Sequence, residues 1–131
     1  MQGKKRIFII DDEEIIVKSL KELLTLSDFE AEATMQAKDI LRMVKAFRPH
    51  LILLDLLMPH VGGLEVCEML NNDKETQGIP IIVVSALDKE ADIKKAYHGG
   101  VVGYVTKPYD FTKLVQEINK AIAYKEEKPL S

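Results

Sequence analysis

Short apolar runs recur along this chain, separated by longer segments whose apolar residues are spaced as on one face of a helix. Such runs are too short to span a membrane, and they predict strands buried on both faces of a sheet. One further segment, Glu30–Ala33, alternates acid with alanine, which predicts an edge strand with one exposed face. The buried strands are predicted over Arg6–Ile10, Leu51–Leu54, Ile79–Val84 and Val101–Val105.

The segments between the runs predict helices, because their apolar residues recur at intervals of three and four. Asp12 or a neighbour is expected to cap the first helix, whose positive end suits the acids there. Gly62 and Gly63 predict a flexible turn. The helices are expected from Asp12 to Leu26, Ala37 to Phe47, Leu64 to Leu70, Asp88 to Tyr97, and from Phe111 to about Ile122.

Strands and helices thus alternate five times along the chain. Strands this apolar need helices on both faces, which predicts an α/β fold: a five-stranded parallel sheet in a three-layer sandwich. The crossover connections should be right-handed. A chain of 131 residues is long enough for one such domain with a real core.

Composition narrows the function classes. The net charge of −3 argues against direct nucleic-acid binding, which requires a basic face. No apolar run reaches the roughly 18 residues of a membrane span, and the N-terminus does not resemble a secretory signal. The single cysteine, Cys67, excludes an internal disulfide, fits a reducing cytoplasm and is expected to pack in the core.

Polar residues follow the apolar strands at the points where they end. In a parallel sheet these carboxyl ends share one edge, where functional crevices form. Each residue alone has an ordinary explanation, such as an acid that starts a turn or caps a helix. Their coincidence favours a functional site composed of Asp11, Asp12, Asp55, Ser85 and Lys107, with Tyr104 three residues before the lysine.

The residue types at this edge suit phosphoryl transfer. Three neighbouring carboxylates repel one another unless a cation lies between them, and Mg²⁺ accepts such oxygen ligands. Lys107 cannot bind a metal but can balance an anion, and the Ser85 hydroxyl can donate a hydrogen bond to one. A carboxylate nucleophile with these groups can form an aspartyl phosphate. From the residues alone, Asp55 remains a turn residue, a nucleophile or a metal ligand.

The chain resembles the receiver domains of two-component response regulators over roughly Lys5 to Tyr124. The resemblance implies a flavodoxin-like, CheY-like fold with strand order 2-1-3-4-5. It also implies a receiver domain at residues 1–124, with 125–131 as a tail or the start of a linker. It rests on Asp11-Asp12, Asp55-x-x-Met58-Pro59 with Gly63 behind it, Ser85-Ala86, and Tyr104-x-x-Lys107-Pro108.

The resemblance implies roles for the acidic residues. Asp55 would be the phosphoacceptor. Asp11, Asp12 and Asp55 would hold Mg²⁺, with the backbone carbonyl of Leu57 as a further ligand. The chain would then be a regulatory phosphoacceptor domain that assists its own phosphorylation and dephosphorylation, and not an ordinary enzyme.

The resemblance also implies a switch. Ser85 would bind a phosphoryl oxygen and shift toward it, Lys107 would pair with Asp55 or its phosphate, and Tyr104 would turn inward as Ser85 moves. The Lys107–Pro108 bond is expected to be cis. The output face would comprise the fourth helix, fifth strand and fifth helix.

The implied partners lie on both sides of this switch. The phosphoryl donor would be a phosphohistidine on a sensor histidine kinase or a histidine phosphotransfer protein. The output face would control a downstream target or an output domain outside this chain. Nothing in the sequence identifies the kinase or the pathway.

Two leucines depart from the polar residues that many receivers carry near the acceptor. Leu57 lies two positions after Asp55, and Leu87 lies two positions after Ser85. Both would lie where a hydrolytic water approaches. The hypothesis is that this apolar cover lengthens the life of the phosphorylated form.

Three other classes share parts of this pattern. Aspartate phosphatases place a second Asp two residues after the nucleophile, where this chain has Leu57. A receiver-like module that is not phosphorylated usually lacks an acid or the lysine, and this chain keeps them. A flavodoxin-like cofactor binder would need a phosphate-binding loop after the first strand, where Asp11 to Glu14 would repel phosphate.

Overall fold

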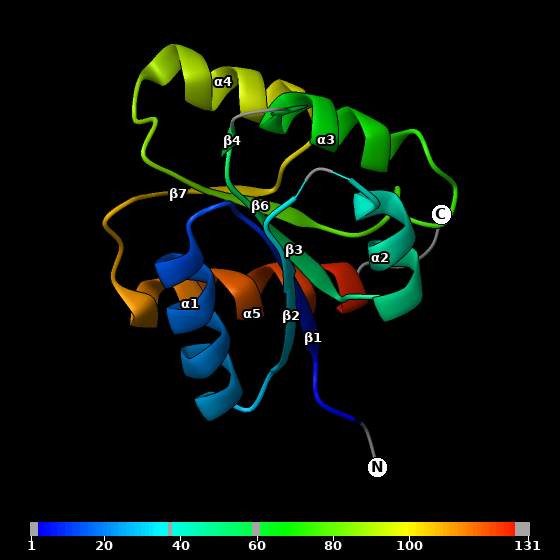
Figure 1. The fold of residues 1–131 in the computed structure, drawn as a ribbon, viewed down its shortest axis with the longest axis vertical. Coiled ribbons are helices and arrows are strands. Elements are labelled where there is room, and N and C mark those ends of the chain that lie inside the picture. Colours follow the sequence, from blue (N-terminus) through cyan, green and yellow to red (C-terminus); the bar gives the residue numbers. More distant parts are fainter. Residues whose placement is uncertain (1–2, 37, 59–60, 128–131) are drawn as a thin grey trace.

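The computed structural model describes residues 3–36, 38–58 and 61–127 and contains one five-stranded parallel sheet (Figure 1). Its strand order is β2-β1-β3-β6-β7, which confirms the predicted order 2-1-3-4-5 for the five main strands. A short antiparallel pair, β4 (Leu57–Met58) and β5 (Val61–Gly62), forms a separate ribbon. The main strands are β1 (Arg6–Ile10), β2 (Glu30–Thr34), β3 (Leu51–Leu54), β6 (Ile81–Ser85) and β7 (Gly103–Thr106).

Helices cover both faces of the sheet, which confirms the three-layer sandwich (Figure 1). On one face, α1 and α5 share a core cluster with Ile7, Ile9 and Leu53. On the other, α2, α3 and α4 share a cluster with Phe8 and Ile10. The helices are α1 (Glu14–Leu26), α2 (Ile40–Phe47), α3 (Gly63–Asn71), α4 (Glu90–His98) and α5 (Phe111–Glu127).

The central strands are apolar except for Arg6 at the start of β1 and Ser85 at the end of β6, because successive side chains enter opposite halves of the core. In β1, Ile7 and Ile9 pack against α1 and α5, while Phe8 and Ile10 pack on the other face. Fully burying one such side chain stabilises the fold by about 1.5–3 kcal/mol. The edge strand β2 instead leaves its two glutamates largely in solvent, so its alternating pattern is also confirmed.

Several predicted boundaries shift in the structure. Pro80 has no N–H to donate and lies before β6, although its carbonyl still accepts from the Ile52 N–H at 3.0 Å. The expected flexible turn at Gly62 and Gly63 is wrong, since Gly62 belongs to β5 and Gly63 begins α3. Helix α5 continues to Glu127, whose neighbour Glu126 forms an ion pair with Lys5.

The predicted cap of α1 is also corrected. Glu13 occupies the N-cap position, but no side chain there makes a capping hydrogen bond. The Asp11 carboxylate instead accepts from the Glu13 N–H at 2.9 Å, so this acid orders the turn before the helix. Ala37, Pro59 and the segment 128–131, which the sequence assigned to a helix, a motif and a tail, lie outside the described residues.

Cys67, on the inner face of α3, is buried in the core cluster, as predicted. Burial raises the pKa of its thiol to about 11, so the group stays protonated and unreactive at neutral pH. Within the described ranges, no helix combines the length and apolar character that a membrane crossing requires.

Gly63 is required by a close backbone approach. A Cβ at this position would lie 2.5 Å from the Leu56 Cα, whereas at Gly62 the nearest atom would be 3.6 Å away. We expect Gly63→Ala to lower the free energy of unfolding by about 1–3 kcal/mol through overpacking. The matched variant Gly62→Ala should change it by less than about 0.5 kcal/mol. Urea denaturation of both variants tests this, and equal stabilities would contradict it.

His50 should make stability depend on pH. Its Nδ1 accepts from the Arg6 backbone N–H at 2.9 Å, so the imidazole must be neutral there. Burial, with nearby Arg6 and Lys5, lowers the pKa of His50. The unfolded chain therefore takes up this proton first, and stability falls as pH drops from about 6.5 toward the lower folded pKa.

The variant His50→Asn keeps an acceptor but does not titrate, so it serves as the reference. Urea denaturation at pH 7.5 and 5.5 should show a larger loss of stability for the unmodified chain than for His50→Asn. The same loss in both proteins would show that His50 does not contribute to the pH dependence.

Candidate functional site

Strands β1 and β3 are neighbours in the sheet and end at the same height, so the acids that follow them lie side by side. Ile10 and Leu54 are paired in the sheet, so Asp11 and Asp55 follow at the same height. The Asp55 N–H also donates to the Ile10 carbonyl at 2.9 Å. Both acids are only 3% exposed. Carboxylates held this far from water require a cation or hydrogen-bond donors nearby.

Three acids at this edge are arranged to hold a metal ion. One carboxylate oxygen from each of Asp11, Asp12 and Asp55 lies within 4.8 Å of the others. Ligands of one hard cation, each about 2.0–2.6 Å from it, lie at such separations. Burial is the largest cause of a raised pKa at Asp11, and a bound cation would oppose that rise. The residues present therefore fit a divalent cation.

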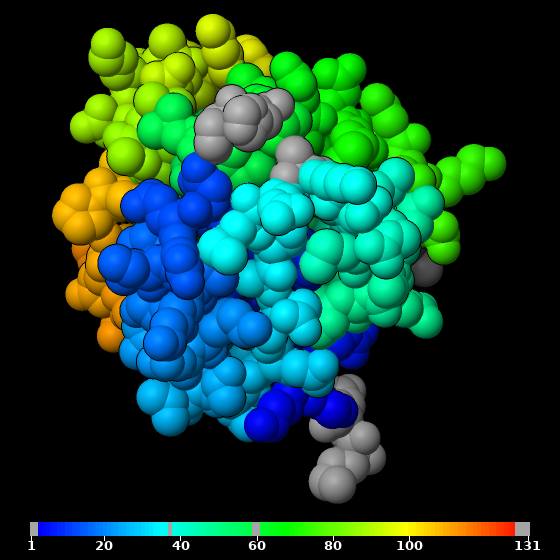
Figure 2. Space-filling model, viewed as in Figure 1, coloured from blue at the N-terminus to red at the C-terminus, as the bar shows by residue number. Residues whose placement is uncertain are grey.

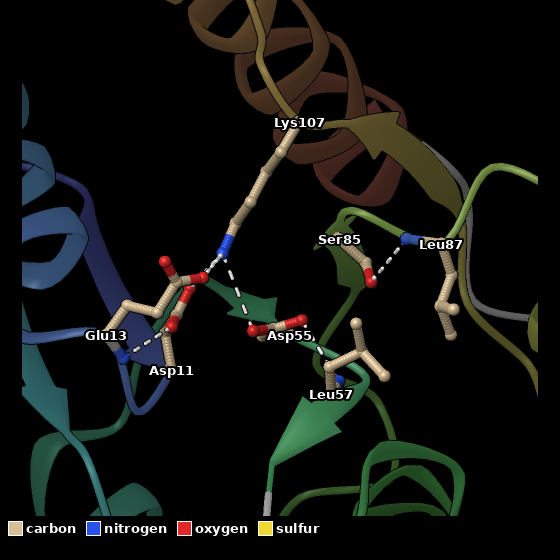
Figure 3. Close-up of polar contacts among 7 residues, drawn as sticks. All are labelled: Asp11, Glu13, Asp55, Leu57, Ser85, Leu87 and Lys107. Atoms are coloured by element: carbon tan, nitrogen blue, oxygen red, sulfur yellow. Dashed lines mark hydrogen bonds and ion pairs between the residues drawn. The ribbon is translucent and has the colours of Figure 1, made fainter.

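The Lys107 ammonium bridges the carboxylates of Asp11, Glu13 and Asp55 (Figure 3). Its Nζ lies 2.8 Å from Glu13 Oε1, 2.9 Å from Asp11 Oδ2 and 3.5 Å from Asp55 Oδ2. Burial lowers the pKa of Lys107, but the hydrogen bonds that its ammonium donates to Glu13 and Asp11 outweigh that effect, and the net shift of the pKa is upward. The side chain therefore remains an ammonium ion in the site.

The backbone after β7 fixes where Lys107 begins. Its N–H donates to the Ser85 carbonyl at 2.8 Å, which continues the pairing of β6 with β7 by one residue. The Lys107–Pro108 peptide bond is cis, as predicted.

The Asp55 carboxylate is held by two different donors. Oδ1 accepts from the Leu57 backbone N–H at 3.0 Å, and Oδ2 faces the Lys107 ammonium. The Leu57 side chain is 50% exposed beside this carboxylate (Figure 3). The sequence assigned Leu57 a carbonyl role at the metal, which stays a prediction; the described contact is through its N–H.

Ser85 and Tyr104 both bond to the backbone of one residue, Leu87. Ser85 is fully buried at the end of β6, and its Oγ accepts from the Leu87 N–H at 3.2 Å. The Tyr104 hydroxyl donates to the Leu87 carbonyl at 2.6 Å, and its ring packs on the core beside α4. In Figure 3, Ser85 and Leu87 flank Asp55 on the side away from Asp11 and Glu13. The hydroxyl and the aromatic ring are thus coupled through Leu87.

Sequence reasoning missed Glu13. It treated this residue as one of several acids at the start of a helix, but its carboxylate reaches Lys107, 94 positions away. The sequence feature that could have pointed to Glu13 is the acidic run Asp11 to Glu14. The conformation of the loop decides that Glu13, and not Glu14, contacts Lys107.

The arrangement gathers four carboxylates, three of which contact the Lys107 ammonium group, so the site carries excess negative charge. A divalent cation would relieve the repulsion, and an incoming anion could then be balanced by Lys107. Asp55 has a carboxylate at the strand end and is held by donors on both oxygens. These are the properties of a carboxylate that can act as a nucleophile.

Comparison with known proteins agrees with this geometry. The family model of the response regulator receiver domain matches residues 7–119. The polar-differentiation response regulator DivK of Brucella anthropi is 32% identical over 114 residues, covering 87% of this chain and 93% of that protein. DivK of Brucella ovis matches with the same identity and coverage.

Solved structures share the fold. A CheY-like receiver domain protein from Methanospirillum hungatei superposes with a TM-score of 0.88 at 25% identity, covering 97% of this chain and 100% of that one. The chemotaxis protein CheY4 of Vibrio cholerae gives a TM-score of 0.84 at 18% identity over 90% of this chain and 98% of that one, a likeness of fold alone. With the family match over residues 7–119 and DivK relatives along most of the chain, this protein belongs to the response regulator receiver domain family.

Proposed function

We propose that this chain is a phosphorylation-activated signalling switch in which Asp55 accepts a phosphoryl group from a phosphohistidine. The observation that supports this most directly is the meeting of Asp11, Asp12 and Asp55 with Lys107 at one end of the sheet. An Asp55 oxygen attacks phosphorus as the phosphorus–nitrogen bond to the donor imidazole breaks. That imidazole nitrogen leaves with the bond's electron pair and takes up a proton.

Each residue of the site has a proposed part in this transfer. Asp11, Asp12 and Asp55 hold Mg²⁺ together with the Leu57 carbonyl, and the ion supplies neutralising charge to the phosphoryl oxygens. Lys107 balances the remaining negative charge from the other side. The Leu57 N–H keeps the Asp55 carboxylate oriented through its 3.0 Å contact with Oδ1.

The switch follows from the contacts around Leu87. Once a phosphoryl group is present, the Ser85 hydroxyl donates to one of its oxygens and moves toward it. The Leu87 N–H then loses its acceptor, and the Leu87 carbonyl moves with it. The Tyr104 hydroxyl follows and its ring turns further inward. This shifts the population of conformers of the output face formed by α4, β7 and α5.

The proposed partners follow from family membership. A sensor histidine kinase or a histidine phosphotransfer protein supplies the phosphoryl group in the cytoplasm, and a downstream target reads the output face. DivK, a response regulator of polar differentiation, has the same domain over most of its length. We propose that the receiver domain occupies residues 1–124; its last helix continues to Glu127, so residues 125–127 of the predicted tail are helical.

The proposal predicts phosphorylation at one residue. Incubation with acetyl phosphate and Mg²⁺ should add the mass of one phosphoryl group, as followed by intact-protein mass spectrometry. Asp55→Asn should gain none, because the amide is not a nucleophile, and chelation of Mg²⁺ should prevent the gain in the unmodified chain. The exposed acid Asp88, in the loop after β6, provides the matched control, since Asp88→Asn should react like the unmodified chain.

If a folded Asp55→Asn variant still gained a phosphoryl group, the acceptor would be another residue and the proposal would be refuted. A folded chain that takes up no phosphoryl group from acetyl phosphate or from purified histidine kinases would point to a module that acts without phosphorylation.

The lifetime of the phosphorylated form should depend on the two leucines. Leu57 and Leu87 present apolar side chains on the side of Asp55 that Ser85 occupies (Figure 3). We expect the double variant Leu57→Asn, Leu87→Asn to lose its phosphoryl group about tenfold faster, because polar side chains admit and orient water. The loss of added mass after removal of the donor measures this.

Leu26→Asn at the exposed end of α1 is the control and should leave the lifetime unchanged. A half-life of seconds in the unmodified chain would refute the idea that these leucines protect the phosphoryl group.

A further inference from the structure

We propose that, in the unphosphorylated protein, Glu13 holds the Lys107 ammonium toward the loop between β1 and α1, so that its contact with Asp55 is the longest of three, and that this slows phosphoryl uptake. This inference rests on the proposed function of Asp55, and it concerns a residue for which the sequence suggested only a role at a helix end. Glu13 is a positioning residue here, because it acts through Lys107 and does not touch the acceptor.

The distances within the site support a competition for one ammonium group. Lys107 Nζ lies 2.8 Å from Glu13 and 2.9 Å from Asp11, but 3.5 Å from Asp55 (Figure 3). The two shorter contacts both go to the loop between β1 and α1. The Lys107 side chain is only 11% exposed, so few positions are open to its ammonium group. Its position in the site is therefore set mainly by the first strand's loop.

The backbone of that loop explains why Glu13 reaches the lysine. The Glu13 N–H donates to the Asp11 carboxylate at 2.9 Å, and its carbonyl accepts from the Val17 N–H at 3.0 Å. The backbone of Glu13 is thus held on both sides of its Cα. The Glu13 side chain makes no capping hydrogen bond at the start of α1, which leaves its carboxylate available to Lys107.

The contact matters because of where charge develops during transfer. A phosphoryl group on its way to Asp55 carries negative charge on oxygens that lie beyond the Asp55 carboxylate, and Lys107 must approach them to stabilise it. Movement in that direction weakens the 2.8 Å contact with Glu13. Glu13 is 56% exposed, so solvent reduces the strength of this restraint without removing it.

The test compares two single charge removals in the same loop. Glu13→Gln keeps the size of the side chain and removes its charge. Glu14→Gln makes the same change one residue later, at an exposed position that is not among the ion-pair partners of Lys107 in the described chain. With acetyl phosphate and Mg²⁺, Glu13→Gln should be phosphorylated about threefold faster than the unmodified chain, the effect of losing one partly exposed ion pair.

Glu14→Gln should match the unmodified chain in this assay. An equal acceleration in both variants would mean that general repulsion of the anionic donor is responsible, and the restraint would be refuted. An unchanged or slower rate in Glu13→Gln would refute it as well.

A second measurement does not depend on phosphorylation. The ¹⁵N signal of the Lys107 ammonium group reports its hydrogen bonding, and its protons exchange slowly with water while the group is held by carboxylates. In the metal-free protein, Glu13→Gln should shift this signal and speed the exchange, and Glu14→Gln should do neither. No change with Glu13→Gln would refute the contact itself. If no variant is phosphorylated while this shift is seen, the proposed function fails and the Glu13 contact stands.

Discussion

The ammonium group of Lys107 joins strand ends that would otherwise repel each other. Asp11 and Asp55 are both almost fully buried, and their carboxylates follow adjacent strands at the same height. The lysine comes from β7, at the far edge of the sheet, and its backbone is fixed by the end of β6. A single ion cluster therefore ties the first strand's loop, the third strand's end and the last strand together.

That cluster is stable only because the rest of the sheet is so apolar. Strands β1, β3 and β6 are buried on both faces, apart from Arg6 at the start of β1, so their side chains cannot shift to separate the acids. The space-filling view shows the elements closely packed on the face that it presents (Figure 2). A rigid interior keeps the like charges of the carboxylates close together. Binding of a cation relieves their repulsion, which strengthens the binding of the cation.

The contacts between this cluster and the surface pass through the backbone of one residue, Leu87. Ser85 lies in the core beside Asp55, Tyr104 lies partly exposed on β7, and both bond to Leu87. Few hydrogen bonds need to change for a charge at Asp55 to affect the surface near α4. In the proposed switch, these contacts would be the parts of a two-state element, as a population shift requires. The lysine bridge and the Leu87 contacts lie on opposite sides of Asp55, so different contacts would carry charge balance and the proposed switching.

Much of this protein was determined by its sequence alone. The apolar runs specified the strands, the helical stripes specified the layers, and the polar residues after Ile10, Leu54 and Val84 specified which edge holds the site. Those features depend on the local spacing of apolar and polar residues, which can be read directly from the sequence. The strand boundaries near Pro80 and the last turn of α5 depended on long-range hydrogen bonds and ion pairs, and they were predicted less well.

The tertiary structure alone decided that Glu13 reaches Lys107 beside Asp11 and that the Leu57 N–H holds Asp55. Asp11, Asp12, Glu13 and Glu14 are consecutive and chemically alike, so periodicity cannot separate them. The turn ordered by Asp11 directs Glu13 toward a lysine 94 residues away. Side-chain contacts at such sequence separations follow from the packing of the whole sheet, and no local pattern in the chain encodes them.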